Sequence, residues 1–194
     1  MKKVAITGGI GSGKSVVAEF LRTIGYPVYN SDEESKRLLN ENQELREKLS
    51  ETFGKDLYKN GQLDKALFAS LIFGNEKLLE QANEIIHPAV YQDFERWSKA
   101  QNSDIVFIET ALYFRSDGKK YIPFSIFVQA PLELRIQRVM QRDNYTEKEV
   151  LARIKSQMPD ENIEHLADFH ISNDEKCLII PQVLQIVEVI SAYP

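Results

Sequence analysis

Short runs of apolar and β-branched residues alternate with longer stretches of helical spacing along most of the chain. The runs cover residues 3–7, 27–30, 105–109, 124–130 and 169–172. An alternation of strands and helices is typical of a parallel sheet covered by helices on both faces. We therefore predict an α/β protein with a five-stranded parallel sheet, whose ligand site lies beyond the carboxyl ends of the strands.

The longest helical stretch lies between the second and third predicted strands. Residues 31–100 have nearly continuous helical spacing, with breaks expected at 54–61, at Gly74 and at Pro88. Glycine and proline interrupt helices because glycine is too flexible and proline lacks a backbone N–H. A block of this length exceeds a simple connection between strands. We interpret residues of about 33–100 as an inserted helical lobe that binds the substrate.

A second helical insertion follows the fourth predicted strand. Its two helices are expected over residues 131–142 and 147–158. Thr146 and Glu149 have the spacing of a capping box, in which each side chain accepts a hydrogen bond from the other residue's backbone, so they mark the start of the second helix. We interpret residues of about 131–158 as a helical lid.

The composition restricts the classes of function. A hydrophobic share of 43% and a charged share of 27% are typical of a globular protein, and 194 residues suffice for one sizeable core. A net charge of −5 offers no broad positive surface, so we expect no nucleic-acid partner. No apolar run fits a membrane span or a secretion signal. With Cys177 as the single cysteine, an internal disulfide is excluded, and we expect a cytoplasmic protein.

The strongest motif is the segment 8–15, Gly-Gly-Ile-Gly-Ser-Gly-Lys-Ser, which fits the P-loop pattern G-x-x-x-x-G-K-[ST]. It directly follows a predicted strand and precedes a helical run over residues 16–22. Its N–H groups and the helix N-terminus form an anion site, where Lys14 meets the β- and γ-phosphates and the Ser15 hydroxyl coordinates Mg²⁺. The predicted ATP-binding residues of this loop are Gly9, Ile10, Gly11, Ser12, Gly13, Lys14 and Ser15.

A P-loop predicts a nucleotide but not a reaction, because kinases, GTPases and motor ATPases share it. A guanine-specific switch usually has an Asn-Lys-x-Asp element after a later strand, and this sequence contains none. A kinase needs an acceptor site, a group that orients the acceptor hydroxyl and cations that neutralise the transferring phosphoryl group. A kinase is therefore favoured, with a different nucleotide or nucleoside acceptor and a nucleotide-dependent switch as the alternatives.

Asp32 is the candidate that orients the acceptor hydroxyl. It lies just past the second predicted strand, at the same edge of the sheet as the P-loop. A carboxylate there could accept a proton from the attacking hydroxyl. The alternative is structural, because Ser31 and Asp32 are also suited to cap the helix that follows.

Four arginines in the predicted lid are candidate phosphate ligands. Arg135, Arg138 and Arg142 share one helix face, and Arg153 follows the intervening turn. Guanidinium groups on a lid can bind phosphate oxygens and stabilise the charge of the transferring phosphoryl group. The alternative is a solvated helix face, where charged residues usually lie.

Two further positions are candidate ligands. His87 either contacts a phosphate of the acceptor or only packs beside Pro88 in the helical lobe. Glu109 ends the third predicted strand, where an acidic residue could hold Mg²⁺ through a water molecule.

Taken together, these motifs resemble those of the dephospho-CoA kinase family, and the resemblance covers most of the chain. The similar segments are residues 6–15, 28–32, 87–88, 137–143, 153, 157–159 and 167–173. The chain departs from the family pattern at Glu109, where aspartate is common, and at Asn30, where a first aspartate is frequent. A proline that commonly follows the acidic residue is also absent, since the segment here is Glu109-Thr110-Ala111.

The resemblance implies a nucleoside-monophosphate-kinase-like core with a CoA-binding lobe and a lid. It implies transfer of the γ-phosphoryl group of ATP, with Mg²⁺, to the ribose 3′-hydroxyl of dephospho-CoA, the last step of coenzyme A synthesis. It further implies that Asp32 is the base and that Asp32 and His87 contact the acceptor. Lys14, Arg138 and Arg142 would then be catalytic, and Arg142 and Arg153 would bind ATP. We expect a monomer.

Overall fold

The computed structural model describes residues 1–115, 118–155, 157 and 160–193. The chain forms two compact units. One unit combines Met1–Tyr29 with Ala100–Pro194, and the other consists of Asn30–Lys99. The first unit is called the core unit below, and the second is called the helical lobe.

The core unit is built on a parallel sheet. The strands are β1 (Lys2–Thr7), β2 (Val28–Asn30), β5 (Ile105–Glu109), β6 (Phe124–Gln129) and β7 (Phe169–Ser172), in the order β2-β5-β1-β6-β7. β1 pairs in parallel with both β5 and β6, and β6 pairs in parallel with β7. The predicted five-stranded parallel sheet is thus confirmed, and each strand lies within two residues of its predicted bounds.

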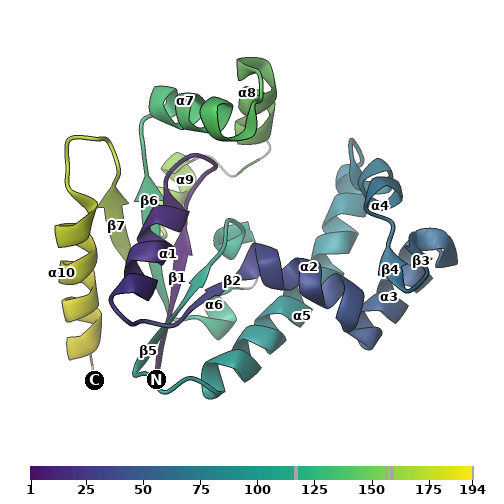
Figure 1. Ribbon diagram of the computed structural model, residues 1–194, viewed down its shortest axis with the longest axis horizontal. Helices are drawn as coiled ribbons and strands as arrows, with labels where there is room; N and C mark the ends of the chain where they lie inside the picture. Colours follow the sequence, from purple (N-terminus) through teal and green to yellow (C-terminus); the bar gives the residue numbers. More distant parts are fainter. Residues whose placement is uncertain (116–117, 156, 158–159, 194) are drawn as a thin grey trace. The chain divides into compact units, whose positions relative to one another are not determined.

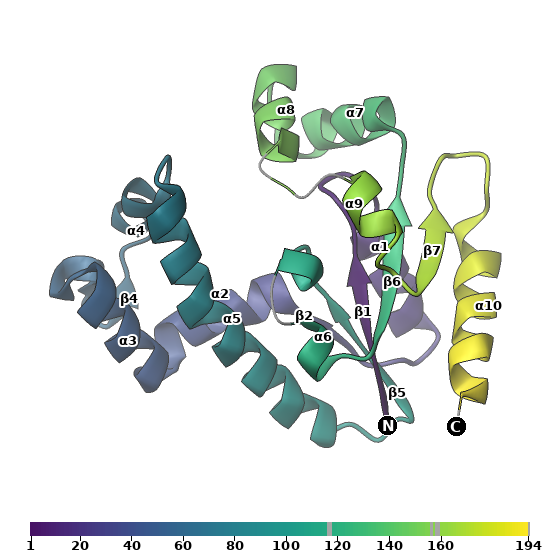
Figure 2. The same ribbon diagram turned by 180° about the vertical axis from the view of Figure 1, so that it is seen from behind.

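Helices cover both faces of this sheet. The helices of the core unit are α1 (Lys14–Thr23), α6 (Gly118–Tyr121), α7 (Leu132–Asp143), α8 (Glu147–Lys155), α9 (Asp160–Glu164) and α10 (Ile179–Ala192), with a 3₁₀ turn η2 at Tyr113–Arg115. α1 and α10 lie on one face, as Figure 1 shows, whereas α6 and α9 lie on the other, as Figure 2 shows. α7 and α8 lie beyond the carboxyl ends of β1 and β6.

The main core of this unit lies between the sheet and the helices α1 and α10. Alternate strand residues, such as Val4 and Ile6 of β1, point into it because successive side chains of a strand face opposite sides. Leu21 of α1 and Ile190 of α10 meet them from the helices and are fully buried. Each such aliphatic side chain contributes roughly 1.5–3 kcal/mol on burial, so this packing fixes the strand ends that carry the site.

The turn between the two lid helices, α7 and α8, contains the predicted capping box. α7 ends at Asp143, and Asn144 adopts the left-handed conformation with a φ of 54°. Thr146 donates its backbone N–H to Glu149 Oε2 at 2.8 Å, and Glu149 donates its N–H to Thr146 Oγ1 at 3.4 Å. The predicted capping box is therefore present. α8 ends at Lys155, and the predicted helical residues 156 and 158 lie outside the described residues.

The helical lobe contains four α-helices and a small hairpin among its described residues. Its elements are α2 (Ser31–Glu41), α3 (Gln43–Phe53), the 3₁₀ turn η1 (Lys55–Leu57), β3 (Tyr58–Lys59), β4 (Gln62–Leu63), α4 (Lys65–Ile72) and α5 (Glu76–Lys99). Asn42 separates α2 from α3, because its side chain accepts the N–H of Leu45 and starts a new helix. The predicted breaks at 54–61 and at Gly74 are present.

The predicted break at Pro88 is wrong, because α5 continues through this residue to Lys99. Proline inside a helix removes one backbone hydrogen bond and costs about 3 kcal/mol. The helix persists because it buries an apolar stripe on both sides of the proline, with Ala82 before it and Val90, Tyr91 and Phe94 after it. Tertiary packing therefore outweighs the local preference. No described helix is both long enough and apolar enough to cross a membrane.

Candidate active site

The loop between β1 and α1 forms an anion-binding site from its own backbone. Gly13 has a φ of 97° and immediately precedes α1, whose first residue is Lys14. Within the described part of the chain, the N–H groups of Gly11, Gly13 and Ser15 donate to no other residue. Lys14 extends its ammonium group back over the loop, with Nζ at 3.3 Å from the Gly9 carbonyl oxygen. Free N–H groups, a helix N-terminus and a cation meet here, which suits a polyphosphate.

The glycines of the loop are needed because other segments approach them closely. A Cβ on Gly9 would lie 2.1 Å from Arg135 Nη2, and one on Gly11 would lie 2.6 Å from the Arg135 carbonyl oxygen. A Cβ on Gly13 would lie 2.1 Å from Asn173 Nδ2. Real Cβ atoms do not come so close, so the loop packs against α7 and against the turn after β7 only when these positions carry no side chain.

The two predicted magnesium ligands lie side by side. The Ser15 hydroxyl donates to Glu109 Oε1 at 2.6 Å. Glu109 ends β5, where it pairs in register with Ile6 at the end of β1, and its side chain is almost fully buried. No group of three or more His, Cys, Asp or Glu residues that could hold a metal occurs among the described residues. A hydroxyl and one carboxylate nevertheless fit Mg²⁺, which takes few protein ligands beside phosphate oxygens and water.

The lid arginines divide into two kinds. Arg135 is buried, and its Nε donates to the Ile10 carbonyl oxygen at 2.9 Å, while Arg138 donates to the Asn173 carbonyl oxygen at 3.2 Å. These two hold the P-loop and the turn after β7, so the alternative of a solvated face does not apply to Arg135.

The other two lid arginines are exposed on their helices. Arg142 pairs with Asp143 at 2.8 Å, and this hydrogen bond raises the pKa of the guanidinium group. The Arg153 guanidinium lies over the Tyr145 ring, 4.3 Å from its centre, and donates to the Tyr145 hydroxyl at 3.0 Å. Their predicted roles toward ATP stay predictions.

Asp32 does not cap its helix, which corrects the structural alternative for this residue. Asn30 is the N-cap of α2, and its Oδ1 accepts the backbone N–H groups of Asp32 at 3.1 Å and Glu33 at 3.3 Å. Ser31 is buried, and the Asp32 side chain is exposed in the first turn. The departure from the family pattern at Asn30 therefore has a physical role, since an Asn side chain is among the best N-caps. The Asp32 carboxylate is left available for other contacts.

His87 lies in the middle of α5, in the helical lobe. Its side chain is half-buried, and burial lowers the pKa of the imidazole from its usual value. The neutral form is therefore favoured inside the fold. Its predicted contact with an acceptor phosphate stays a prediction.

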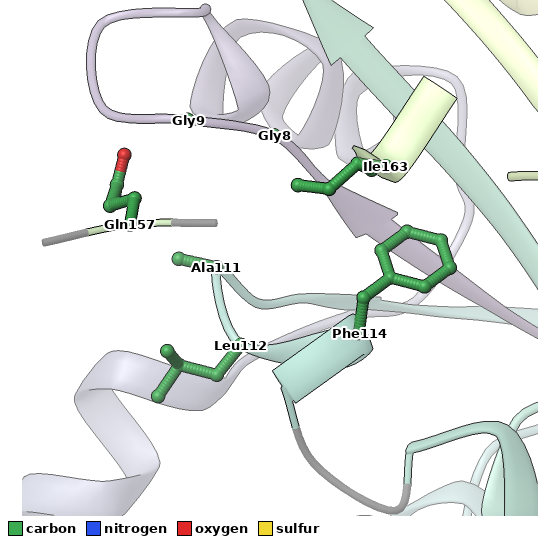
Figure 3. A pocket seen from close by; sticks show the side chains of 7 residues that line it. All are labelled: Gly8, Gly9, Ala111, Leu112, Phe114, Gln157 and Ile163. Carbon is green, nitrogen blue, oxygen red and sulfur yellow. The ribbon is translucent and has the colours of Figure 1, made fainter. Parts of the chain in front are cut away.

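Two residues that the sequence analysis assigned no role contact the P-loop. Gln157 Oε1 accepts the Ile10 N–H at 2.8 Å, and Asn173 Nδ2 donates to the Ser12 carbonyl oxygen at 2.8 Å. Gln157 also lines a pocket beside the start of the loop, together with Gly8, Gly9, Ala111, Leu112, Phe114 and Ile163 (Figure 3). The contacts join residues 147 and 161 positions apart, so local patterning does not indicate them, although both residues lie in segments that resemble the family's.

Known proteins resemble this chain over nearly its whole length. The family model described as dephospho-CoA kinase matches residues 2–178. A dephospho-CoA kinase of Bacteroides fragilis is 40% identical over 186 residues, which cover 95% of this chain and 91% of the relative. One of Porphyromonas gingivalis is 40% identical over 191 residues, which cover 98% of this chain and 95% of the relative.

Solved structures agree with the fold. A crystal structure of a Thermus thermophilus protein is 32% identical, has a TM-score of 0.81 and covers 98% of this chain and 96% of that one. A dephospho-CoA kinase from Campylobacter jejuni has a TM-score of 0.58 at 24% identity, with 98% and 96% covered, and shares the fold. Because the family model spans most of the residues and relatives at 40% identity span nearly all of them, this chain belongs to the dephospho-CoA kinase family.

Proposed function

We propose that this protein transfers the γ-phosphoryl group of ATP to the ribose 3′-hydroxyl of dephospho-CoA and thereby completes coenzyme A. Membership of the dephospho-CoA kinase family supports this reaction. The observation that carries the chemistry is the hydrogen bond between Ser15 and Glu109 beside the glycine-rich loop, because it brings two Mg²⁺ donors to the place where the β- and γ-phosphates would lie.

In this proposal the core unit binds ATP. The N–H groups of the loop hold the phosphates, and Lys14 neutralises the β- and γ-phosphate oxygens. Ser15 would hold Mg²⁺ directly and Glu109 would hold it through water, and the ion would supply positive charge that stabilises the phosphoryl group during transfer. Arg142 and Arg153 would contact ATP, and Arg138 would stabilise the transferring group, when the lid covers the site.

The helical lobe supplies the acceptor side. Asp32 would accept the proton of the 3′-hydroxyl as its oxygen bonds to the γ-phosphorus, while the bond to the β,γ-bridging oxygen breaks and ADP leaves. His87 would contact the acceptor in this lobe. Covering the site would exclude water, so hydrolysis of ATP without acceptor should be slow. We further propose a cytoplasmic monomer whose partners are dephospho-CoA and ATP, without nucleic acid or membrane.

The test is release of ADP from ATP and Mg²⁺ in the presence of different acceptors. We expect dephospho-CoA to drive release, and nucleosides and nucleoside monophosphates to leave the rate at its acceptor-free level. Coenzyme A is the matched control, because it differs from dephospho-CoA only in its blocked 3′-hydroxyl and should not be phosphorylated. Chelation of Mg²⁺ with EDTA should stop the reaction, and added Mg²⁺ should restore it. Release driven by another acceptor, or by none, would contradict the assignment.

A further inference from the structure

Gln157 joins the lid to the P-loop at Ile10. Ile10 is held on both sides, because its N–H donates to Gln157 Oε1 at 2.8 Å and its carbonyl oxygen accepts Arg135 Nε at 2.9 Å. Gln157 itself is held by its backbone, whose N–H donates to the Ile154 carbonyl oxygen at 3.0 Å in the turn after α8. The Gln157 side chain therefore lies beside the loop at Gly9, with its oxygen pointing toward the loop (Figure 3).

The contact with Ile10 also determines which way the carboxamide faces. A backbone N–H can only donate, so the atom it meets must be the carbonyl oxygen of Gln157 and not its amide nitrogen. The Nε2 group, with two hydrogens to donate, is then turned away from the Ile10 N–H. Gln157 lines the pocket beside Gly8 and Gly9, and a donor there is suited to an anion.

This pocket lies on the magnesium side of the loop. The segment after β5 runs beside the segment after β1, because Glu109 pairs with Ile6 and the Thr110 N–H donates to the Ile6 carbonyl oxygen at 3.0 Å. Ala111 and Leu112, which line the pocket, follow Glu109 directly. Ser15 and Glu109 would hold Mg²⁺ at this edge of the sheet, and the γ-phosphoryl group of a P-loop kinase lies beside that ion, so it would lie toward this pocket.

We infer that Gln157 is a catalytic residue whose Nε2 donates a hydrogen bond to the γ-phosphoryl group during transfer. The loop N–H groups and Lys14 hold the phosphates from one side, and Gln157 adds a donor from the lid segment. A neutral donor aimed at developing charge stabilises a transition state more than the ground state, so its loss lowers kcat. This inference rests on the proposed ATP-dependent phosphoryl transfer but not on the identity of the acceptor.

Gln157→Glu separates this role from a purely structural one. A glutamate has the same length and keeps an oxygen that accepts the Ile10 N–H. A purely structural role, which needs only this hydrogen bond, would therefore be retained. The glutamate replaces the donor with a negative charge that repels the phosphoryl group. Gln185→Glu, at an exposed position on α10, is the matched control for the added charge.

We expect kcat to fall about 100-fold in Gln157→Glu and to stay at the wild-type value in Gln185→Glu. Without any acceptor, binding of the β,γ-imido analogue of ATP should weaken roughly tenfold in Gln157→Glu, whereas binding of ADP should not change, because ADP has no γ-phosphate. Wild-type kcat together with wild-type affinity for the analogue would overturn the inference and leave Gln157 as a brace for Ile10.

A second variant and the comparison of the ATP analogue with ADP keep the inference falsifiable. If circular dichroism shows that Gln157→Glu is unfolded, Gln157→Asn replaces it, because the shortened amide should also lose kcat; a wild-type rate for that variant would overturn the inference. If the wild-type enzyme ignores dephospho-CoA, the proposed function fails, yet the difference between the ATP analogue and ADP still decides the role of Gln157.

Discussion

The glycines of the P-loop and those of the helical lobe serve different purposes. At Gly9, Gly11 and Gly13 an added Cβ would meet atoms of Arg135 or Asn173 at 2.6 Å or less. At Gly54 and Gly74 it would meet no atom within 4 Å, although both have a positive φ. The loop glycines make room for long-range contacts, whereas these lobe glycines only permit a local turn.

Because of this difference, we expect substitutions at the two sets of glycines to affect different properties. A change in the loop would displace the segments that we propose bind ATP, so it should appear mainly in the kinetics. A change at an open turn strains only the local backbone, so it should appear mainly in the free energy of unfolding. In the proposed reaction the lobe also supplies Asp32 as the base, so this residue is the sharpest exception to test.

The largest effect is expected from the cation of the loop. Lys14→Ala removes the charge that we propose meets the β- and γ-phosphates, so kcat/KM for ATP should fall roughly 10³-fold or more. Lys99→Ala, at an exposed position at the end of α5, is the control and should keep wild-type kinetics. Both variants should give the wild-type circular dichroism spectrum, and a near-native rate for Lys14→Ala would contradict the loop assignment.

Asp32→Asn tests whether the helical lobe takes part in chemistry. Loss of a general base typically costs about 10²–10⁴-fold, so kcat should fall in this range while the affinity for ATP changes little. Glu33→Gln is the matched control, because it removes an exposed carboxylate from the same first turn of α2. If both variants lose activity equally, or neither does, Asp32 is not the base.

Gly13→Ala tests the steric role of a loop glycine. Gly13 has a φ of 97°, and a Cβ there would displace the Asn173 side chain from the Ser12 carbonyl oxygen. We expect the KM for ATP to rise by roughly tenfold, because the loop N–H groups lose their arrangement. Steady-state kinetics at saturating acceptor measures this, and an unchanged KM would show that the loop tolerates a side chain.

Gly74→Ala is the counterpart in the lobe. Its φ of 76° disfavours alanine by about 1–2 kcal/mol, but its surroundings are open. The free energy of unfolding in urea should fall by about that amount, and kcat and KM should not change. A loss of kcat would mean that this turn contributes to the site and would remove the contrast between the two sets of glycines.

The smallest effect concerns the pH dependence of stability. Burial lowers the pKa of His87 below its usual value, so the unfolded chain binds this proton more readily than the folded chain. Neutral His87 makes its full contribution to the free energy of unfolding at higher pH. This contribution is lost as the pH falls below about 6.5. His87→Asn should therefore reduce the loss of stability between about pH 7.5 and pH 5.5, measured by urea unfolding, whereas His165→Asn, at an exposed position, should not.

The features that the sequence predicted correctly are mostly those that depend on residues close together in the chain. The strand runs, the loop motif and the capping box at Thr146 each depend on neighbouring residues, and all three are present in the structure. The Asn60-Gly61 turn between β3 and β4, with φ values of 50° and 80°, has the signature of a two-residue hairpin, so this pair is a further local signal in the sequence.

The errors arose where tertiary packing decides. Pro88 stays inside a helix because the helix is buried on both sides of it, and the N-cap of α2 is Asn30 and not Ser31 or Asp32. Gln157 and Asn173 reach the P-loop across most of the chain, so only the folded structure brings them to it. Ser15 and Glu109 were each predicted as magnesium ligands from their own segments, and the hydrogen bond between them appears only in the structure.

The most direct test of the central claim is the position of the phosphoryl group in the product. ³¹P and ¹H NMR of the product formed from ATP, Mg²⁺ and dephospho-CoA should show a new phosphomonoester coupled to the ribose 3′ proton, with one ADP for each product molecule. Inorganic phosphate without a new phosphomonoester, or a phosphoryl group at another position, would contradict the assignment of this chain as the kinase that completes coenzyme A.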